Sequence, residues 1–152
     1  MVMPLRSLAV AIDGSEGGQR ALEQAVDIAK ASGIPLSIVA VVPKRETYGM
    51  DPQQRYVVRP EERRFLTEVL SRAEAHARAT GVVSVRTELL EGPVVDQLLS
   101  FFEDRHPDLI VLGARGISAT RRLFLGSVSE AILHHAHGSV LIVRPPERGS
   151  KA

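Results

Sequence analysis

The feature that most constrains the fold is a regular alternation between two hydrophobic rhythms. Short apolar runs, typical of strands covered on both faces, alternate with segments whose apolar residues recur at the helical period. The segments that predict strands are 8–12, 36–42, 83–89, 109–112 and 140–143. Because a helical segment joins each strand to the next, the sequence predicts an α/β fold with a parallel sheet, right-handed connections and helices on both faces.

The helical segments carry their own start and stop signals. We predict a first helix over 19–31 that Gly33 closes, and a second that begins near Pro60 and ends at Gly81. The third opens at Gly92-Pro93, and the fourth follows Gly126. The residues expected to face the core from the second helix are Phe65, Leu66, Val69, Leu70, Ala73 and Ala77. The third strand, in which Val83, Val85, Thr87 and Leu89 alternate with mainly polar residues, is predicted near an edge of the sheet.

Composition narrows the class of protein. A length of 152 residues suits one domain, predicted over 1–146, with a polar tail at 147–152 expected to be disordered. The absence of cysteine excludes disulfides, zinc ribbons and thiol nucleophiles. The formal net charge of +1 argues against a nucleic-acid partner. No apolar run is long enough to span a bilayer and no export signal is recognisable, so we expect a soluble, cytoplasmic protein without a membrane partner.

A glycine-bearing loop follows the fourth predicted strand. It begins as Gly113-Ala114-Arg115-Gly116 and, nine residues later, ends in Gly126-Ser127-Val128-Ser129 at a helix start. Glycines allow close approach of the backbone to a ligand, and the free N–H groups of a helix N-terminus favour phosphate. In open parallel sheets, ligands bind outside the carboxyl ends of the strands, where this loop lies. The alternative is that the glycines merely permit a turn and that Ser127 caps the helix.

The pattern Gly-x2-Gly-x9-Gly-Ser resembles the nucleotide-binding signature of the ATP-binding branch of the universal stress proteins. The first strand ending in Asp13-Gly14-Ser15, the second ending in Val41-Val42-Pro43, and the final Val-Leu-Ile-Val-Arg-Pro also resemble that family. The resemblance covers nearly the whole domain. It implies a single-domain, Rossmann-like fold with an open sheet of five parallel strands in the order 3-2-1-4-5, and a homodimer.

The resemblance also implies which residues bind the nucleotide. Asp13 would bind the ribose or the edge of the adenine ring, and Val41 would contact adenine. The glycine-bearing loop would surround the ribose and the phosphates. The implied nucleotide-binding residues are Ala11, Asp13, Val41, Gly113, Arg115, Gly116, Gly126, Ser127, Val128 and Ser129. Without the resemblance, the alternatives are that Asp13 is a helix-capping acid and that Arg115 is a solvated loop charge. The chain departs from the family at Gly18, where a serine is common, which would cost the first helix a possible cap.

Three further groups of residues invite a functional interpretation. His134, His135 and His137 suggest a metal site, but imidazoles near a helix C-terminus are also favoured by the helix dipole. Arg121 and Arg122 lie in the nine-residue segment between Gly116 and Gly126. Either they bind the negatively charged phosphates or they are ordinary surface arginines. The connection 44–59, with Tyr48 and Tyr56, either closes over a base or packs on itself.

The last predicted strand has its own consequence for assembly. A strand at the edge of a sheet exposes unpaired backbone groups that invite another chain. The residues of this apolar edge are Val140, Leu141, Ile142 and Val143. We therefore predict a two-fold dimer through this strand, in agreement with the family resemblance; the alternative is that a loop or the tail covers it.

The leading hypothesis is an ATP-binding dimeric regulator of the stress response, with Mg or Mn on the phosphates, that signals to a protein partner of unknown identity. The sequence lacks a Gly-x4-Gly-Lys-Ser/Thr loop, and no base is placed by sequence to activate Ser127 or Ser129, so no catalytic residue is assigned. One alternative is a slow ATPase or nucleotide hydrolase that uses Arg115, Ser127 and a bound metal. Another is a sensor of AMP or cyclic AMP, or an interaction module without a ligand.

Overall fold

The computed structural model describes residues 4–46, 56–114 and 126–146. Its main sheet has five parallel strands, in the spatial order β5-β2-β1-β6-β7. Their bounds are β1 Leu8–Ala11, β2 Leu36–Pro43, β5 Val85–Gly92, β6 Leu109–Gly113 and β7 Ser139–Val143. Counted along the chain this is the order 3-2-1-4-5, so the predicted fold is confirmed, with β5 and β7 at the two edges. The predicted tail at 147–152 lies outside the described residues.

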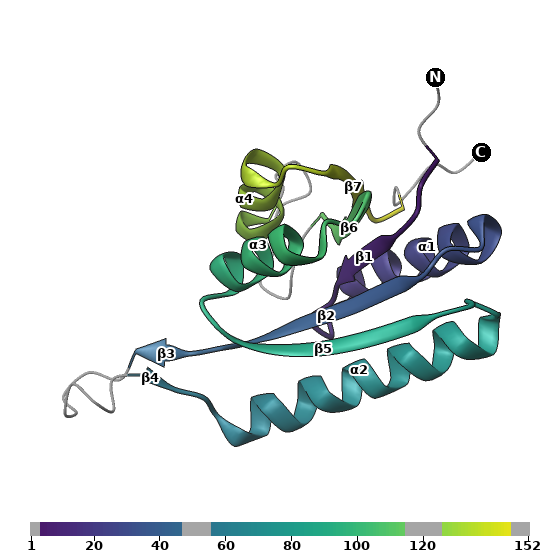
Figure 1. Cartoon of the computed structure of the whole chain (residues 1–152). Coiled ribbons are helices and arrows are strands. Elements are labelled where there is room, and N and C mark those ends of the chain that lie inside the picture. The colour runs from purple at the N-terminus through teal and green to yellow at the C-terminus, as the bar shows by residue number, and fades with distance from the viewer. Residues whose placement is uncertain (1–3, 47–55, 115–125, 147–152) are drawn as a thin grey trace.

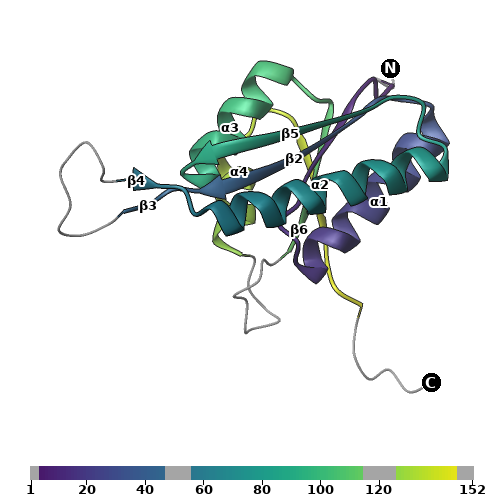
Figure 2. The ribbon, with the colours of Figure 1, turned by 90° about the horizontal axis from the view of Figure 1, so that it is seen from below.

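In the described residues, four helices cover the sheet, two on each face (Figures 1 and 2). Their bounds are α1 Glu16–Ser32, α2 Pro60–Thr80, α3 Val94–Arg105 and α4 Ser127–His135. Successive residues of a strand point to opposite faces, so each buried strand contributes side chains to two hydrophobic cores, one on each face of the sheet. Leu8, Val10 and Ile38 pack with α1 and α2, whereas Ala9 and Val39 pack with α3 and α4. In the described part of the chain, no helix combines the length and the hydropathy needed to cross a membrane.

Helix ends follow the local signals of the sequence. Ser15 caps α1, since its side-chain oxygen accepts a hydrogen bond from the Gly18 N–H at 3.1 Å. The cap that the departure at position 18 was expected to remove is therefore supplied by Ser15. At the other end, Gly33 takes the left-handed conformation (φ 64°) that terminates a helix without a Cβ penalty. Pro60 occupies the first turn of α2, as predicted.

Two predicted details of packing are wrong. Phe65 was expected in the core, but it is 49% exposed. Its ring lies at the margin of α2 against the β1–α1 loop, where a Cβ on Gly14 would be 2.6 Å from the ring. Val83 was expected in a strand, but it precedes β5 and is 76% exposed. Pairing begins at Leu36 with Val85, so Val83 has no residue of β2 opposite it.

The long connection after β2 contains an element that the sequence did not reveal. Strands β3 (Arg45–Glu46) and β4 (Tyr56–Val57) pair antiparallel as the stem of a hairpin. The stem projects beyond the carboxyl end of β2 (Figure 1). Tyr48 lies outside the described residues, so the structure does not test its predicted role over a base.

Candidate functional site

The carboxyl ends of β1, β2 and β6 form the candidate site. Here the winding of the chain reverses, because β1 lies between β2 and β6, and the crossovers to these neighbours run on opposite faces. The Ile12 N–H extends the pairing of β1 by donating to the Val39 carbonyl at 2.9 Å. Asp13, Val41 and Gly113 all lie at this end of the sheet. Topology therefore brings together residues that are up to 100 positions apart in sequence.

Asp13 belongs to a small hydrogen-bonded turn at the start of α1. Its Oδ1 atom accepts hydrogen bonds from the Ser15 backbone N–H, at 2.9 Å, and from the Ser15 hydroxyl. Ser15, rather than Asp13, is the capping residue of the helix. Asp13 therefore does not cap α1 itself, as one alternative held. Its role in the cap is indirect, because it orients Ser15, the residue that caps the helix. The half-buried carboxylate commits one oxygen to this turn.

Gly113 is fixed by a close approach of two backbones. A Cβ at this position would lie 2.6 Å from the carbonyl oxygen and 2.7 Å from the carbonyl carbon of Gly17. The last residue of β6 therefore packs directly on the first turn of α1, with no space for a side chain. Gly113 has a structural reason to be glycine whether or not a ligand binds. This contact was not predicted from the sequence, although two consecutive glycines, Gly17 and Gly18, in the first turn of a helix are a signal that could have indicated it.

Hydrogen bonds tie the two ends of the glycine-bearing loop to each other and to strands β6 and β7. The Gly126 N–H donates to the Ala114 carbonyl at 2.6 Å, and the Ala114 N–H donates to the Val143 carbonyl at 3.0 Å. Ser129, only 6% exposed, donates its hydroxyl to the Gly113 carbonyl at 2.6 Å. These bonds hold the start of α4 against the end of β6. Arg115, Gly116, Arg121 and Arg122 lie outside the described residues, so their predicted roles are not tested.

The N-terminus of α4 differs from that of α1. Gly126 is its capping residue, and among the described residues no side chain provides a cap there. Ser127 is exposed and is the first helical residue, so the alternative in which Ser127 caps the helix is wrong. The first backbone N–H groups of a helix have no acceptor within the helix. In the part of the chain that the structure describes, no side chain uses these donors at α4, where they coincide with the positive end of the helix dipole.

The apolar candidates lie on the face that α3 and α4 cover. Ala11 and Val41 both pack in the core cluster on that face, and Val41 is 8% exposed. Val128, near the start of α4, packs against the same cluster. The aliphatic side chains are therefore on the same side of the sheet as the uncapped helix start. Such a combination of apolar wall and backbone donors is typical of a site for a flat organic group that carries an anion.

His134, His135 and His137 lie on the surface at the C-terminal end of α4. His134, His135 and His137 are exposed, and the His134 Nε2 atom lies 4.0 Å from a carboxylate oxygen of Glu130. Within residues 4–46, 56–114 and 126–146, no three His, Cys, Asp or Glu side chains are grouped as metal ligands would be. The His cluster that the sequence suggested therefore does not form a protein-built metal site in the described part of the chain.

The fold and this end of the sheet define a doubly wound α/β domain of the kind that binds ligands at the carboxyl ends of its strands. The model of the universal stress protein family matches residues 4–144. The chain therefore belongs to the universal stress protein family. It is 33% identical over 149 residues to a putative universal stress protein of Staphylococcus haemolyticus, covering 96% of this chain and 88% of the relative.

Solved structures of universal stress proteins share the fold. One, described as a complex with cAMP, superposes with a TM-score of 0.70 at 26% identity and covers 95% of this chain and all of that one (100%). Another, from Archaeoglobus fulgidus in complex with dAMP, has a TM-score of 0.70 at 23% identity, covering 93% of this chain and 100% of its own. At 23% identity, the likeness to the second structure shows the shared fold alone.

Proposed function

We propose that this protein is an adenine-nucleotide-binding regulator, with ATP as its leading ligand and Mg or Mn held on the phosphates. The observation that carries the proposal is the start of α4, which has no side-chain cap among the described residues and is tied to the end of β6, the strand beside β1. Family membership supports it, as does the relative described as a complex with cAMP. The nucleotide would act by changing how the protein contacts a partner protein.

Each part of the site would take one part of the nucleotide. The Asp13 carboxylate oxygen that the Ser15 turn does not use would accept a ribose hydroxyl. Ala11 and Val41 would line the base, and the N–H groups at Ser127 and Val128 would meet phosphate. The Ser129 hydroxyl donates to Gly113, so we assign it a positioning role, holding α4 in place. Gly113 and Gly126 would keep the backbone close to the ligand, and Arg115 and Gly116 would complete the loop.

Calorimetric titration of the full chain with ATP, ADP, AMP and cyclic AMP tests the proposal. Asp13→Asn keeps an oxygen for the Ser15 N–H but removes the charge and one acceptor, so it should weaken ATP binding at least about tenfold. Asp27→Asn, on the exposed side of α1, is the matched control and should leave the affinity unchanged. Gly116→Val should abolish binding, because its side chain would enter the space for phosphate. Equal affinities for wild type and Asp13→Asn would contradict the assignment.

Cyclic AMP is the second candidate ligand, because the relative at 26% identity is described as a complex with it. A cyclic monophosphate has no triphosphate to carry a metal ion. Binding of cyclic AMP that is tighter than that of ATP, and unaffected by EDTA, would assign the protein to cyclic-nucleotide sensing. Tighter ATP binding that EDTA weakens would favour the leading proposal.

We also propose a homodimer through β7. The Val143 carbonyl accepts from the Ala114 N–H, so Val143 faces β6, and alternation places the backbone groups of Val140 and Ile142 on the free edge. A second copy would pair there. Sedimentation at micromolar concentration should give twice the 16.5 kDa of one chain. Ile142→Pro, which removes an outward N–H, should shift the equilibrium to monomer; a wild-type monomer would refute the dimer.

A further inference from the structure

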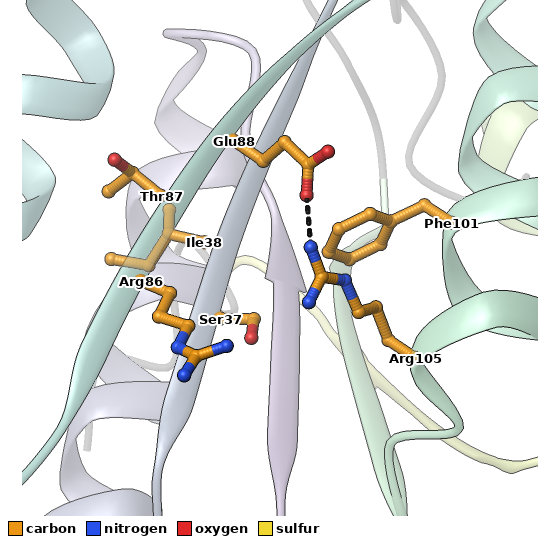
Figure 3. A pocket seen from close by; sticks show the side chains of 7 residues that line it. All are labelled: Ser37, Ile38, Arg86, Thr87, Glu88, Phe101 and Arg105. Atoms are coloured by element: carbon orange, nitrogen blue, oxygen red, sulfur yellow. Dashed lines mark hydrogen bonds and ion pairs between the residues drawn. The ribbon is translucent and has the colours of Figure 1, made fainter.

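A pocket of about 220 Å³ lies at the opposite end of the strands from the proposed nucleotide site. It opens between the β2–β5 edge of the sheet and the last turns of α3 (Figure 3). Ser37 and Arg86 are the second residues of β2 and β5, and Arg105 is the last residue of α3. The residues that line the pocket are Ser37, Ile38, Arg86, Thr87, Glu88, Phe101 and Arg105.

Strand register brings the polar groups of the pocket together. Ser37 pairs with Arg86, and Val39 pairs with Glu88, so these side chains emerge on one face of the sheet. It is the face that α3 covers, because Val39 packs with Phe101. Since β5 is an edge strand, the face is open on its far side. The pocket is thus built by three separate elements and not by one flexible loop.

One arginine of the pocket is held in place. An Arg105 Nη atom lies 3.1 Å from a Glu88 carboxylate oxygen, and the guanidinium lies over the Phe101 ring at 5.7 Å from its centroid. A guanidinium has five N–H donors, so one bond to Glu88 leaves others free. Because the ion pair and the ring already restrain this side chain, binding a further acceptor costs little additional ordering.

The other arginine of the pocket, Arg86, forms no ion pair with the described residues. Arg86 reaches toward Ser37 in Figure 3, and among the described residues its guanidinium has no ion-pair partner. Two arginines against the single Glu88 leave the pocket with an excess of positive charge. An arginine in a pocket with a serine hydroxyl beside it offers the donors that carboxylate and phosphate groups accept in pairs.

We infer that this pocket is a second ligand site, which takes an oxyanion, a carboxylate or phosphate group of a small molecule, between Arg86 and Arg105 with the Ser37 hydroxyl as a further donor. The site is separate from the nucleotide proposal. Asp13 and α4 lie at the carboxyl ends of the strands, whereas Ser37 and Arg86 lie near the amino ends. Neither proposal depends on the other.

The test is an NMR titration of the ¹⁵N-labelled full chain, in separate arms with sodium phosphate and sodium succinate, at ionic strength held constant with sodium chloride. The amide signals of Ser37, Arg86 and Glu88 report on this pocket, so phosphate bound at α4 does not confuse the result. We expect saturable shifts of these signals. Saturation by only one anion supports the site and identifies its class of ligand.

Arg86→Ala should weaken the anion at least about tenfold, as expected for the loss of a charged hydrogen-bond donor. Its side chain is exposed, so the fold should persist. Arg72→Ala, an exposed arginine of α2 on the other face, is the matched control and should change the affinity less than twofold. Shifts that do not saturate with either anion, or equal affinities of wild type and Arg86→Ala, would overturn the inference. Asp13→Asn should leave this titration unchanged.

Discussion

Gly113→Ala is the most direct test of how the candidate site is built. The added Cβ would lie 2.6 Å from the carbonyl oxygen of Gly17 and 2.7 Å from its carbonyl carbon. Insertion of a methyl group into a packed interior costs about 1–3 kcal/mol. The obstructing atoms belong to the backbone of α1 and cannot rotate away, so we expect the upper part of that range, about 2–3 kcal/mol. For a domain of this size the melting temperature should fall by roughly 5–10 °C.

Urea denaturation measures the free energy of unfolding, and Gly33→Ala is its control. A Cβ at Gly33 would meet nothing within 4 Å, so this variant bears only the cost of the left-handed backbone (φ 64°), about 1 kcal/mol. Gly113 does not have a positive φ, so its cost would come from the steric clash alone. A Gly113→Ala variant no less stable than Gly33→Ala would refute the close contact between β6 and α1.

Two further predictions concern the same end of the sheet. Ser129→Ala removes the bond to the Gly113 carbonyl and should lower the free energy of unfolding by about 1–2 kcal/mol, whereas Ser127→Ala, at an exposed position, should have little effect in the same urea titration. Ser15→Ala removes the cap of α1 and should cost about 1 kcal/mol, measured by thermal denaturation; an unchanged melting temperature would contradict the capping role.

Some features of the fold and of the candidate site can be predicted from the sequence. The apolar runs and glycine signals located the strands and helices, because buried strands and helix ends depend on residues a few positions apart. The order 3-2-1-4-5 followed from the family resemblance and not from periodicity, since local patterns do not determine which strands are neighbours. Phe65 shows the same limit. Its position on an apolar stripe is a local property, but its exposure depends on how α2 packs against the loop at Gly14.

The sequence alone determined the class of fold, the edge position of β5, and the ends of two helices at Gly33 and Gly81. It also gave the candidate nucleotide-binding residues of the glycine-bearing loop. Only the tertiary structure decided that Gly113 packs on Gly17, that Ser129 bonds to the Gly113 carbonyl, and that Arg86 and Arg105 share a pocket. The physical reason is the distance along the sequence over which each kind of interaction acts. Propensity and capping act within one turn of the chain, whereas these contacts join residues 16 to 96 positions apart, and only strand register and helix packing bring them together.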